Sequence, residues 1–299
     1  MKVFFASLVL LFVFCDNAYS QDSPDLRDTS AIRIMTYNVK MLPRILTYIH
    51  HKPIKRARLI PQFLIAENVD MIVLEETFDY RADQILKRKL RTAYPYIYGP
   101  ANKKGGGTMF SSGVMILSKY PMKRLEEIKF KSCSGDDCWA RKGAMLVELT
   151  VKGHTIQFMG THLQAGGTPQ IKRDQYAQIE AMLERHARPG VPQILGGDYN
   201  TFRSDTVLYP TMLSILHAED GPISGDIQFT SDDIICDMSE NYCRTLAHYE
   251  QDIIDYILYK GNGLPHRSVT RRITRYMTLW DIDHRDLSDH MTLIMDLKL

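Results

Sequence analysis

Seven polar side chains stand at or just beyond the ends of apolar segments in this chain of 299 residues. They are Asn38, Glu76, His162, Asp198, Asn200, Asp289 and His290. A carboxylate is a good ligand for a hard cation such as Mg²⁺, and a histidine near neutral pH takes or gives a proton. Cleavage of a phosphodiester by water needs a base, a group that stabilises the non-bridging oxygens, and help for the leaving oxygen. Any one of these residues alone is more often a turn or capping residue, but together they predict a metal-dependent phosphodiesterase.

Short apolar, β-branched runs predict the strands that must position these side chains. We expect strands over residues 32–37, 71–74, 114–117, 144–151, 155–159, 193–195, 253–259 and 291–297. Apolar residues at helical spacing predict helices over residues 56–67, 81–92 and 170–186. This alternation favours an α/β layered fold, and the helix-free stretch between residues 114 and 159 predicts antiparallel pairing there. Ligands of such folds bind where strands end, so we expect the polar residues to converge.

Six short strings in the sequence resemble the motifs of a known superfamily, in the same order. They are Thr-Tyr-Asn-Val at residues 36–39, Glu-Glu-Thr-Phe at 75–78, Gly-Thr-His-Leu-Gln-Ala at 160–165, Gly-Gly-Asp-Tyr-Asn-Thr at 196–201, Ile-Asp-Tyr-Ile at 254–257 and Ser-Asp-His at 288–290. They resemble the endonuclease/exonuclease/phosphatase superfamily of the deoxyribonuclease-I type. The resemblance implies a four-layer α/β/β/α sandwich of two mixed, mostly antiparallel sheets flanked by helices.

Within that superfamily the chain looks most like a secreted, bacterial-type neutral sphingomyelinase. The string from His162 to Ala165 and the pair Lys142-Gly143 carry this resemblance, because nucleases and inositol-phosphate phosphatases usually differ at both. It implies hydrolysis of sphingomyelin to ceramide and phosphocholine at a membrane surface, with Mg²⁺ as cofactor and Mn²⁺ or Co²⁺ as substitutes. A secreted, metal-dependent endonuclease acting on nucleic acid is the alternative. The formal net charge of +2 gives no general attraction for a polyanion.

Chemistry and resemblance together suggest a role for each metal-side residue. Glu76 is the natural ligand for Mg²⁺, which takes one or two protein carboxylates and keeps several waters. Asn38 is expected to complete that shell directly or through water. The resemblance implies that His290 is the general base and that Asp289 is a further metal ligand or an orienting group.

The remaining catalytic residues are expected to act on the water and the phosphate. Asp198 and Asn200, two apart on an extended turn, should point the same way, orient the water and bind phosphate. His162, when protonated, would stabilise the phosphoryl oxygens. Asp255 pairs, by resemblance, with one of the histidines, and the sequence does not decide which. Lys142 occupies the family's Lys-Gly position and is expected to bind the phosphate or the head group, with a solvated turn lysine as the equal alternative.

Residues 276–280 lie where secreted sphingomyelinases carry an aromatic hairpin that enters the lipid surface. Leu279 and Trp280 are therefore expected to contact the membrane, and the polar N–H of tryptophan suits an interface. Packing in the core is the alternative for such aromatic residues. Glu75 is expected to face away from Glu76, because neighbouring residues of a strand point to opposite faces, and to be structural.

The first twenty residues have a charged start, an apolar middle and a small-x-small end at Ser20, which predicts a signal peptide. No later run approaches the about 20 apolar residues that span a bilayer. We therefore expect a secreted protein, extracellular or periplasmic. No linker or repeat interrupts residues 21–299, so we expect one catalytic domain, acting as a monomer.

Two close cysteine pairs lie beyond the predicted signal peptide: Cys133 with Cys138, and Cys236 with Cys243. An exported protein meets an oxidising environment, which favours two local disulfides. A zinc site of four thiolates is the competing interpretation, but neither pair has the usual spacing of two intervening residues.

Overall fold

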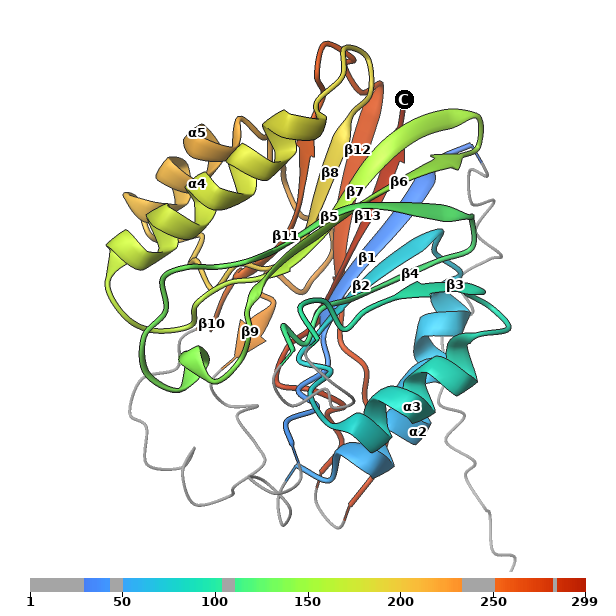
Figure 1. Cartoon of the computed structure of the whole chain (residues 1–299). Coiled ribbons are helices and arrows are strands. Elements are labelled where there is room, and N and C mark those ends of the chain that lie inside the picture. Colours follow the sequence, from blue (N-terminus) through green and yellow to red (C-terminus); the bar gives the residue numbers. More distant parts are fainter. Residues whose placement is uncertain (1–29, 44–50, 104–110, 233–250, 282–283) are drawn as a thin grey trace, which may run out of the picture.

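Residues 30–43, 51–103, 111–232, 251–281 and 284–299 are described by the computed structural model of the chain, and they form two β-sheets with helices on the outer faces (Figure 1). The first sheet has the strand order β12-β13-β1-β2-β4-β3, and the second has the order β11-β8-β7-β6-β5. Neighbouring strands are antiparallel except β1 with β2 and β7 with β8, which are parallel. The expected mixed, mostly antiparallel sheets are confirmed.

The strands of the first sheet are β1 (Ile32–Asn38), β2 (Met71–Glu75), β3 (Tyr96–Tyr98), β4 (Met115–Ser118), β12 (Ser268–Thr274) and β13 (Thr292–Lys298). Those of the second are β5 (Met122–Lys129), β6 (Gly143–Val151), β7 (His154–His162), β8 (Gln193–Asp198) and β11 (Asp255–Lys260). Two short strands, β9 (Ser231–Asp232) and β10 (Gln251–Asp252), pair with each other.

Four helices of the described residues complete the sandwich that the resemblance implied. Helices α2 (Pro53–Glu67) and α3 (Tyr80–Leu90) cover the first sheet, while α4 (Pro169–His186) and α5 (Leu208–Leu216) cover the second (Figure 1). Proline stands in the first turn of α2 and of α4, where its fixed φ suits the helix and its missing N–H costs nothing. The Asp79 side chain caps α3 by accepting from the amides of Arg81 and Ala82. No helix of the described residues is long and apolar enough to cross a membrane.

Strand β1 shows how the layers orient the polar strand ends. Ile32 and Ile34 pack in the core that includes both sheets, whereas Met35 and Tyr37 pack in the core beneath α2 and α3. Successive strand residues point to opposite faces, so Asn38 shares the face of Ile34 and looks toward the second sheet. Asn38 of the first sheet therefore faces the predicted site residues of the second sheet across the sandwich.

The expected strands and helices are confirmed to within a few residues, and the elements that we did not predict are mostly edge elements. Strands β5, β12 and β3 lie at sheet edges. The first two carry charged side chains instead of an apolar alternation, exposed or half-buried in β5 and buried or half-buried in β12. Charges on an edge strand discourage pairing with another chain, and they also hide the strand from a hydrophobic pattern. Helix α5 was missed because its short apolar run contains Pro210.

One of the two predicted disulfides is confirmed. The Sγ atoms of Cys133 and Cys138 are bonded, and the bond closes the loop that contains the short 3₁₀ helix η1 (Gly135–Cys138). This bond excludes a four-thiolate zinc site that would need both residues. Cys236 and Cys243 lie outside the described residues.

Candidate active site

Strand register brings three predicted residues into one row. In the second sheet His162 of β7 is the register partner of Asp198 in β8, and Asp198 is the register partner of Asp255 in β11. The close approach of β8 to β7 requires glycine beside Asp198, because a Cβ on Gly197 would lie 2.2 Å from the carbonyl oxygen of Thr161. His162 and Asp198 are the last residues of their strands, and Asp255 is the first residue of β11. The three residues therefore lie together at one end of the sheet, as expected.

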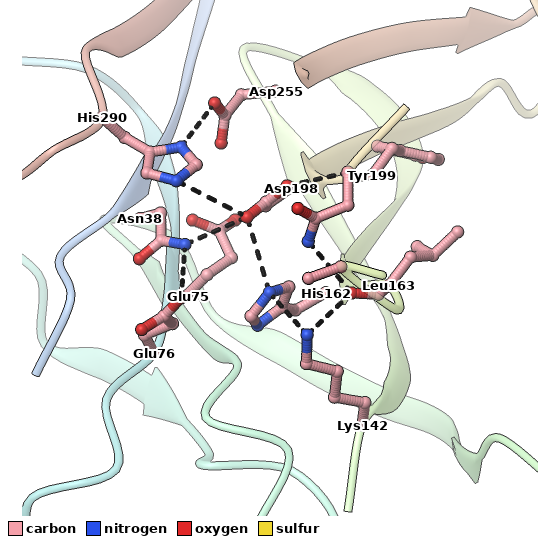
Figure 2. Close-up of polar contacts among 12 residues, drawn as sticks. Asn38, Glu75, Glu76, Lys142, His162, Leu163, Asp198, Tyr199, Asp255 and His290 are labelled. Atoms are coloured by element: carbon pink, nitrogen blue, oxygen red, sulfur yellow. Dashed lines mark hydrogen bonds and ion pairs between the residues drawn. The ribbon is translucent and has the colours of Figure 1, made fainter. Parts of the chain in front are cut away.

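The first sheet contributes Asn38, which joins the two sheets (Figure 2). Its Nδ2 donates to Asp198 Oδ2 at 3.0 Å and to Glu76 Oε1 at 3.0 Å. Its Oδ1 accepts from the backbone N–H of Lys40 at 3.0 Å, which fixes the orientation of the amide, since an N–H must meet an oxygen. In this arrangement Asn38 holds the two carboxylates together through its amide nitrogen.

Glu76 reaches the site because the chain turns directly after β2. Its φ of 58° is left-handed, as is the φ of 44° at Lys40 and of 48° at Asn200. Glu75 remains in the strand on the face toward the other sheet, where its Oε1 accepts from Thr36 Oγ1 at 2.6 Å. Burial, followed by the negative charge of Asp255, raises the pKa of Glu75 well above its usual range. Glu75 thus lies next to the predicted site residues in Figure 2, and its side chain is buried.

The structure decides which histidine Asp255 contacts. His290 Nδ1 lies 2.8 Å from Asp255 Oδ2, and His290 Nε2 lies 3.9 Å from Asp198 Oδ2 (Figure 2). Burial lowers the pKa of His290, but the nearby charges of Asp255, Asp198 and Asp289 outweigh it and raise the pKa well above its usual range. This is the geometry of a base that Asp255 orients and whose protonated form Asp255 stabilises.

Lys142 lies in the site, and it contacts His162, whose protonation state differs from our expectation. Lys142 Nζ contacts His162 Nε2 at 3.0 Å and donates to the Leu163 carbonyl at 2.8 Å. Burial, followed by the charges of Lys142 and His290, lowers the pKa of His162 well below its usual range. The protonated His162 that we considered is therefore wrong for this arrangement, because the adjacent lysine already carries the positive charge. An ammonium only donates, so His162 Nε2 accepts and its hydrogen resides on Nδ1.

Asp198 and Asn200 lie together, though they do not point the same way. Asp198 Oδ1 accepts from the Asn200 amide N–H at 2.8 Å, whereas Asn200 Nδ2 donates to the Leu163 carbonyl at 3.1 Å. The left-handed φ of Asn200 turns its side chain toward β7, and this breaks the simple alternation that we expected. Burial, followed by the charge of Asp255, raises the pKa of Asp198 to about 6.

Asp289 is paired with a residue that the sequence reasoning did not single out. Lys40 Nζ bonds to Asp289 Oδ2, and Ser288 Oγ donates to the Asn38 carbonyl at 2.6 Å. Although burial raises the pKa of Asp289, the charges of Lys40 and His290 lower it below its usual range. The available signal was that Lys40 directly follows the matching string at residues 36–39.

Within the part of the chain that the structure describes, two overlapping groups of side chains have donors close enough for a metal ion. One comprises Glu76, His162 and Asp198, and the other Asp198, Asp255 and His290; within each group the donor atoms lie within 4.8 Å of one another. The carboxylate oxygens of Glu76 and Asp198 suit Mg²⁺, a hard cation with oxygen ligands. Asp289 belongs to neither group.

The predicted membrane contacts differ from each other in exposure. Residues 276–280 return antiparallel to residues 284–287, with Thr278 N donating to Arg285 O at 2.8 Å and Trp280 N to His284 O at 3.0 Å. Leu279 is 62% exposed, but Trp280 is only 6% exposed. The Trp280 ring stacks on His284, and its Nε1 donates to the Asp286 carbonyl at 2.7 Å. The expectation for Trp280 is therefore wrong, because its polar N–H is satisfied inside the protein.

Comparisons with known proteins agree with this geometry. The model of the endonuclease/exonuclease/phosphatase family matches residues 35–290. A phospholipase C of Staphylococcus aureus is 27% identical over 95% of this chain and 92% of its own length. A sphingomyelinase C of Leptospira interrogans is 28% identical over 77% of this chain and 44% of its own length. Among solved structures, a beta toxin variant from Staphylococcus aureus with bound magnesium ions shares the fold with a TM-score of 0.78, at 23% identity, covering 90% of this chain and 100% of its own.

Proposed function

This chain belongs to the endonuclease/exonuclease/phosphatase family, and on that premise we propose that it is a Mg²⁺-dependent phosphodiesterase that hydrolyses sphingomyelin to ceramide and phosphocholine. The observation that carries the proposal is the contact of 2.8 Å between His290 and Asp255, with His290 Nε2 turned toward Asp198 and the metal-type donors. The named activities of the sphingomyelinase C and phospholipase C relatives support the choice of substrate.

The chain's own side chains divide the chemistry between the two sheets. His290 acts in its neutral form, in which Nε2 takes a proton from the attacking water. The charge of Asp255, which raises the pKa of His290, stabilises the imidazolium that forms. Asp198 accepts a hydrogen bond from that water and holds it for attack. We place the phosphoryl group near Lys142, whose positive charge would stabilise the charge that develops in the transition state.

The donor set fits the cation, since Glu76 and Asp198 offer carboxylate oxygens and Asn38 holds them together through one amide nitrogen. We propose that Glu76 is the principal ligand of Mg²⁺. We also propose that Mn²⁺ or Co²⁺ can replace Mg²⁺ at this site. When bound, Mg²⁺ would polarise the phosphoryl oxygens and stabilise the leaving oxygen. Asp289, held by Lys40, acts as an orienting group for the loop that carries His290. The magnesium ions in the solved beta toxin variant support the choice of metal.

The surface beside the site supports a lipid substrate over a nucleic acid. Leu279 and Met277 are exposed apolar residues on the segment that leads to His290, and Trp139 is exposed three residues before Lys142. Exposed apolar side chains of this kind suit contact with a lipid surface. We propose that Leu279 contacts the lipid surface.

We propose that residues 21–299 act as one catalytic domain and as a monomer. The site draws Asn38 and Glu76 from the first sheet and His162 and Asp198 from the second, so neither sheet makes it alone.

We also propose export after cleavage near Ser20, a segment outside the described residues. The disulfide between Cys133 and Cys138 supports an oxidising compartment. The molecular mass of the protein recovered from the medium would test cleavage near Ser20. Gel filtration with light scattering would test whether the protein is a monomer.

The decisive experiment incubates purified protein and its His290→Ala variant with sphingomyelin liposomes and, separately, with plasmid DNA. Each reaction is run with Mg²⁺ and with Mg²⁺ plus excess chelator. We expect release of phosphocholine by the wild type only, and only without chelator. Cleavage of DNA but not of lipid would overturn the proposed substrate, and activity in the presence of chelator would overturn the role of the metal.

A further inference from the structure

Lys142 is held by three partners at once. Its Nζ lies 2.8 Å from Asp137 Oδ1, 2.8 Å from the Leu163 carbonyl oxygen and 3.0 Å from His162 Nε2. An ammonium group has three hydrogens, so each has an acceptor. Lys142 is only 7% exposed, and these contacts fix where its charge stands relative to the row of catalytic side chains.

Asp137 is the only charged member of that set of three, and its second oxygen is also used. Asp137 Oδ2 accepts from the backbone N–H of Ala165 at 2.7 Å. One carboxylate therefore connects the ammonium of Lys142 to the segment of residues 162–165, which contains His162. The proposed function gives a role to Lys142 and none to Asp137.

The loop that carries Asp137 is fastened to the same segment by buried glutamines. Gln164 and the Ser134 backbone exchange two hydrogen bonds, of 3.1 and 2.9 Å. Gln175 of α4 accepts from the Gln164 N–H at 2.9 Å and donates to the Ser132 carbonyl at 3.0 Å. The disulfide between Cys133 and Cys138 closes the loop. Residues 132–138 and 162–165 thus form one unit, in which the position of Asp137 is fixed from both sides.

We propose that Asp137 is a positioning residue for the phosphodiesterase reaction. It holds the Lys142 ammonium against His162 and Leu163, so that the positive charge is already in place when the phosphoryl group arrives. The inference rests on the proposed function, because it needs Lys142 to act on the phosphate. A group fixed before reaction stabilises a transition state without the cost of reorganising at that moment. Asp137 itself touches neither the row of catalytic carboxylates nor the metal-type donors.

The test compares Asp137→Asn with Asp136→Asn, because Asp136 is an exposed neighbour in the same loop and its replacement removes the same charge. Both are measured on sphingomyelin liposomes and on a soluble aryl phosphodiester. We expect Asp137→Asn to lower kcat about tenfold, the size of one charge-assisted hydrogen bond, and Asp136→Asn to change it less than about twofold.

A double-mutant cycle with Lys142→Met separates positioning from a loss of folding. If Asp137 acts through Lys142, Asp137→Asn adds less than about twofold to the effect of Lys142→Met. A full tenfold loss in that background, or an Asp137→Asn enzyme equal to the wild type, would overturn the proposal.

A measurement without substrate keeps the inference separate from the proposed activity. The NMR signal of the Lys142 ammonium, identified by its absence in Lys142→Met, should be observable in the wild type because three partners slow its exchange with water. It should persist in Asp136→Asn and disappear or shift in Asp137→Asn. If the wild type cleaves no phosphodiester, the proposed function fails. An unchanged Lys142 ammonium signal in Asp137→Asn would separately refute the role of Asp137 in positioning Lys142.

Discussion

Replacement of Asp255 by asparagine should separate catalysis from stability. The Asp255 carboxylate is fully buried and meets His290 Nδ1 at 2.8 Å. Asparagine has the same shape but no charge, so the imidazolium formed during the reaction loses its nearest stabilising partner. If the amide nitrogen turns toward Nδ1, the histidine must also carry its proton on Nε2, where it no longer accepts one from water.

The expected loss follows from that one contact. A hydrogen bond to a charged group contributes about 1.5 to 3 kcal/mol, and a loss of about 2 kcal/mol slows a reaction roughly 30-fold. Asp198, with its Oδ2 at 3.9 Å from His290 Nε2, retains part of the stabilisation. The charge of Asp255 adds to the effect of burial in raising the pKa values of Glu75 and Asp198, which indicates repulsion among these buried carboxylates. Because Asp255→Asn removes that repulsion, the stability of the protein should not fall.

The assay is steady-state release of phosphocholine from sphingomyelin liposomes, together with thermal unfolding followed by circular dichroism. We expect kcat to fall at least about 30-fold, with a melting temperature equal to or above that of the wild type. A kcat within about threefold of the wild type would refute the assignment of His290 as a base oriented by Asp255. A large drop in melting temperature would show instead that Asp255 is mainly structural.

Three further predictions concern the metal, the loop and the surface. Glu76→Gln should weaken Mg²⁺ binding, measured by calorimetry, at least about tenfold, whereas Asp289→Asn should change it less than about threefold. A larger loss in Asp289→Asn would make Asp289 the principal metal ligand instead of Glu76. Reduction of the disulfide between Cys133 and Cys138 should lower kcat about threefold, because the glutamine contacts remain to hold the loop, and a double serine variant that no longer responds to reductant is the control. Leu279→Ser should weaken binding to sphingomyelin vesicles while sparing a soluble phosphodiester, with the exposed Ile65→Ser on α2 as the matched control; equal losses on both substrates would contradict a membrane contact.

The interior of the fold was predictable because buried strands must be apolar. Strands such as β2 and β4, buried along their whole length, appear in the sequence as short, mostly apolar runs, and the expected positions agree with the structure to within one residue. The edge strands β5 and β12 carry charges that a hydrophobic pattern cannot assign, since their partners lie on only one side. Their presence depends on the neighbouring strand, which tertiary structure alone supplies.

The sequence by itself determined which residue types stand at the strand ends, and therefore that carboxylates and histidines would gather at one end of the sandwich. Only the tertiary structure decided how they face one another. The left-handed turns at Glu76 and Asn200 overrule strand alternation, and register places Asp198 between His162 and Asp255. The choice of His290 as the partner of Asp255, and the place of Asp137 beside Lys142, depend on contacts between segments far apart in the chain, which no local pattern encodes.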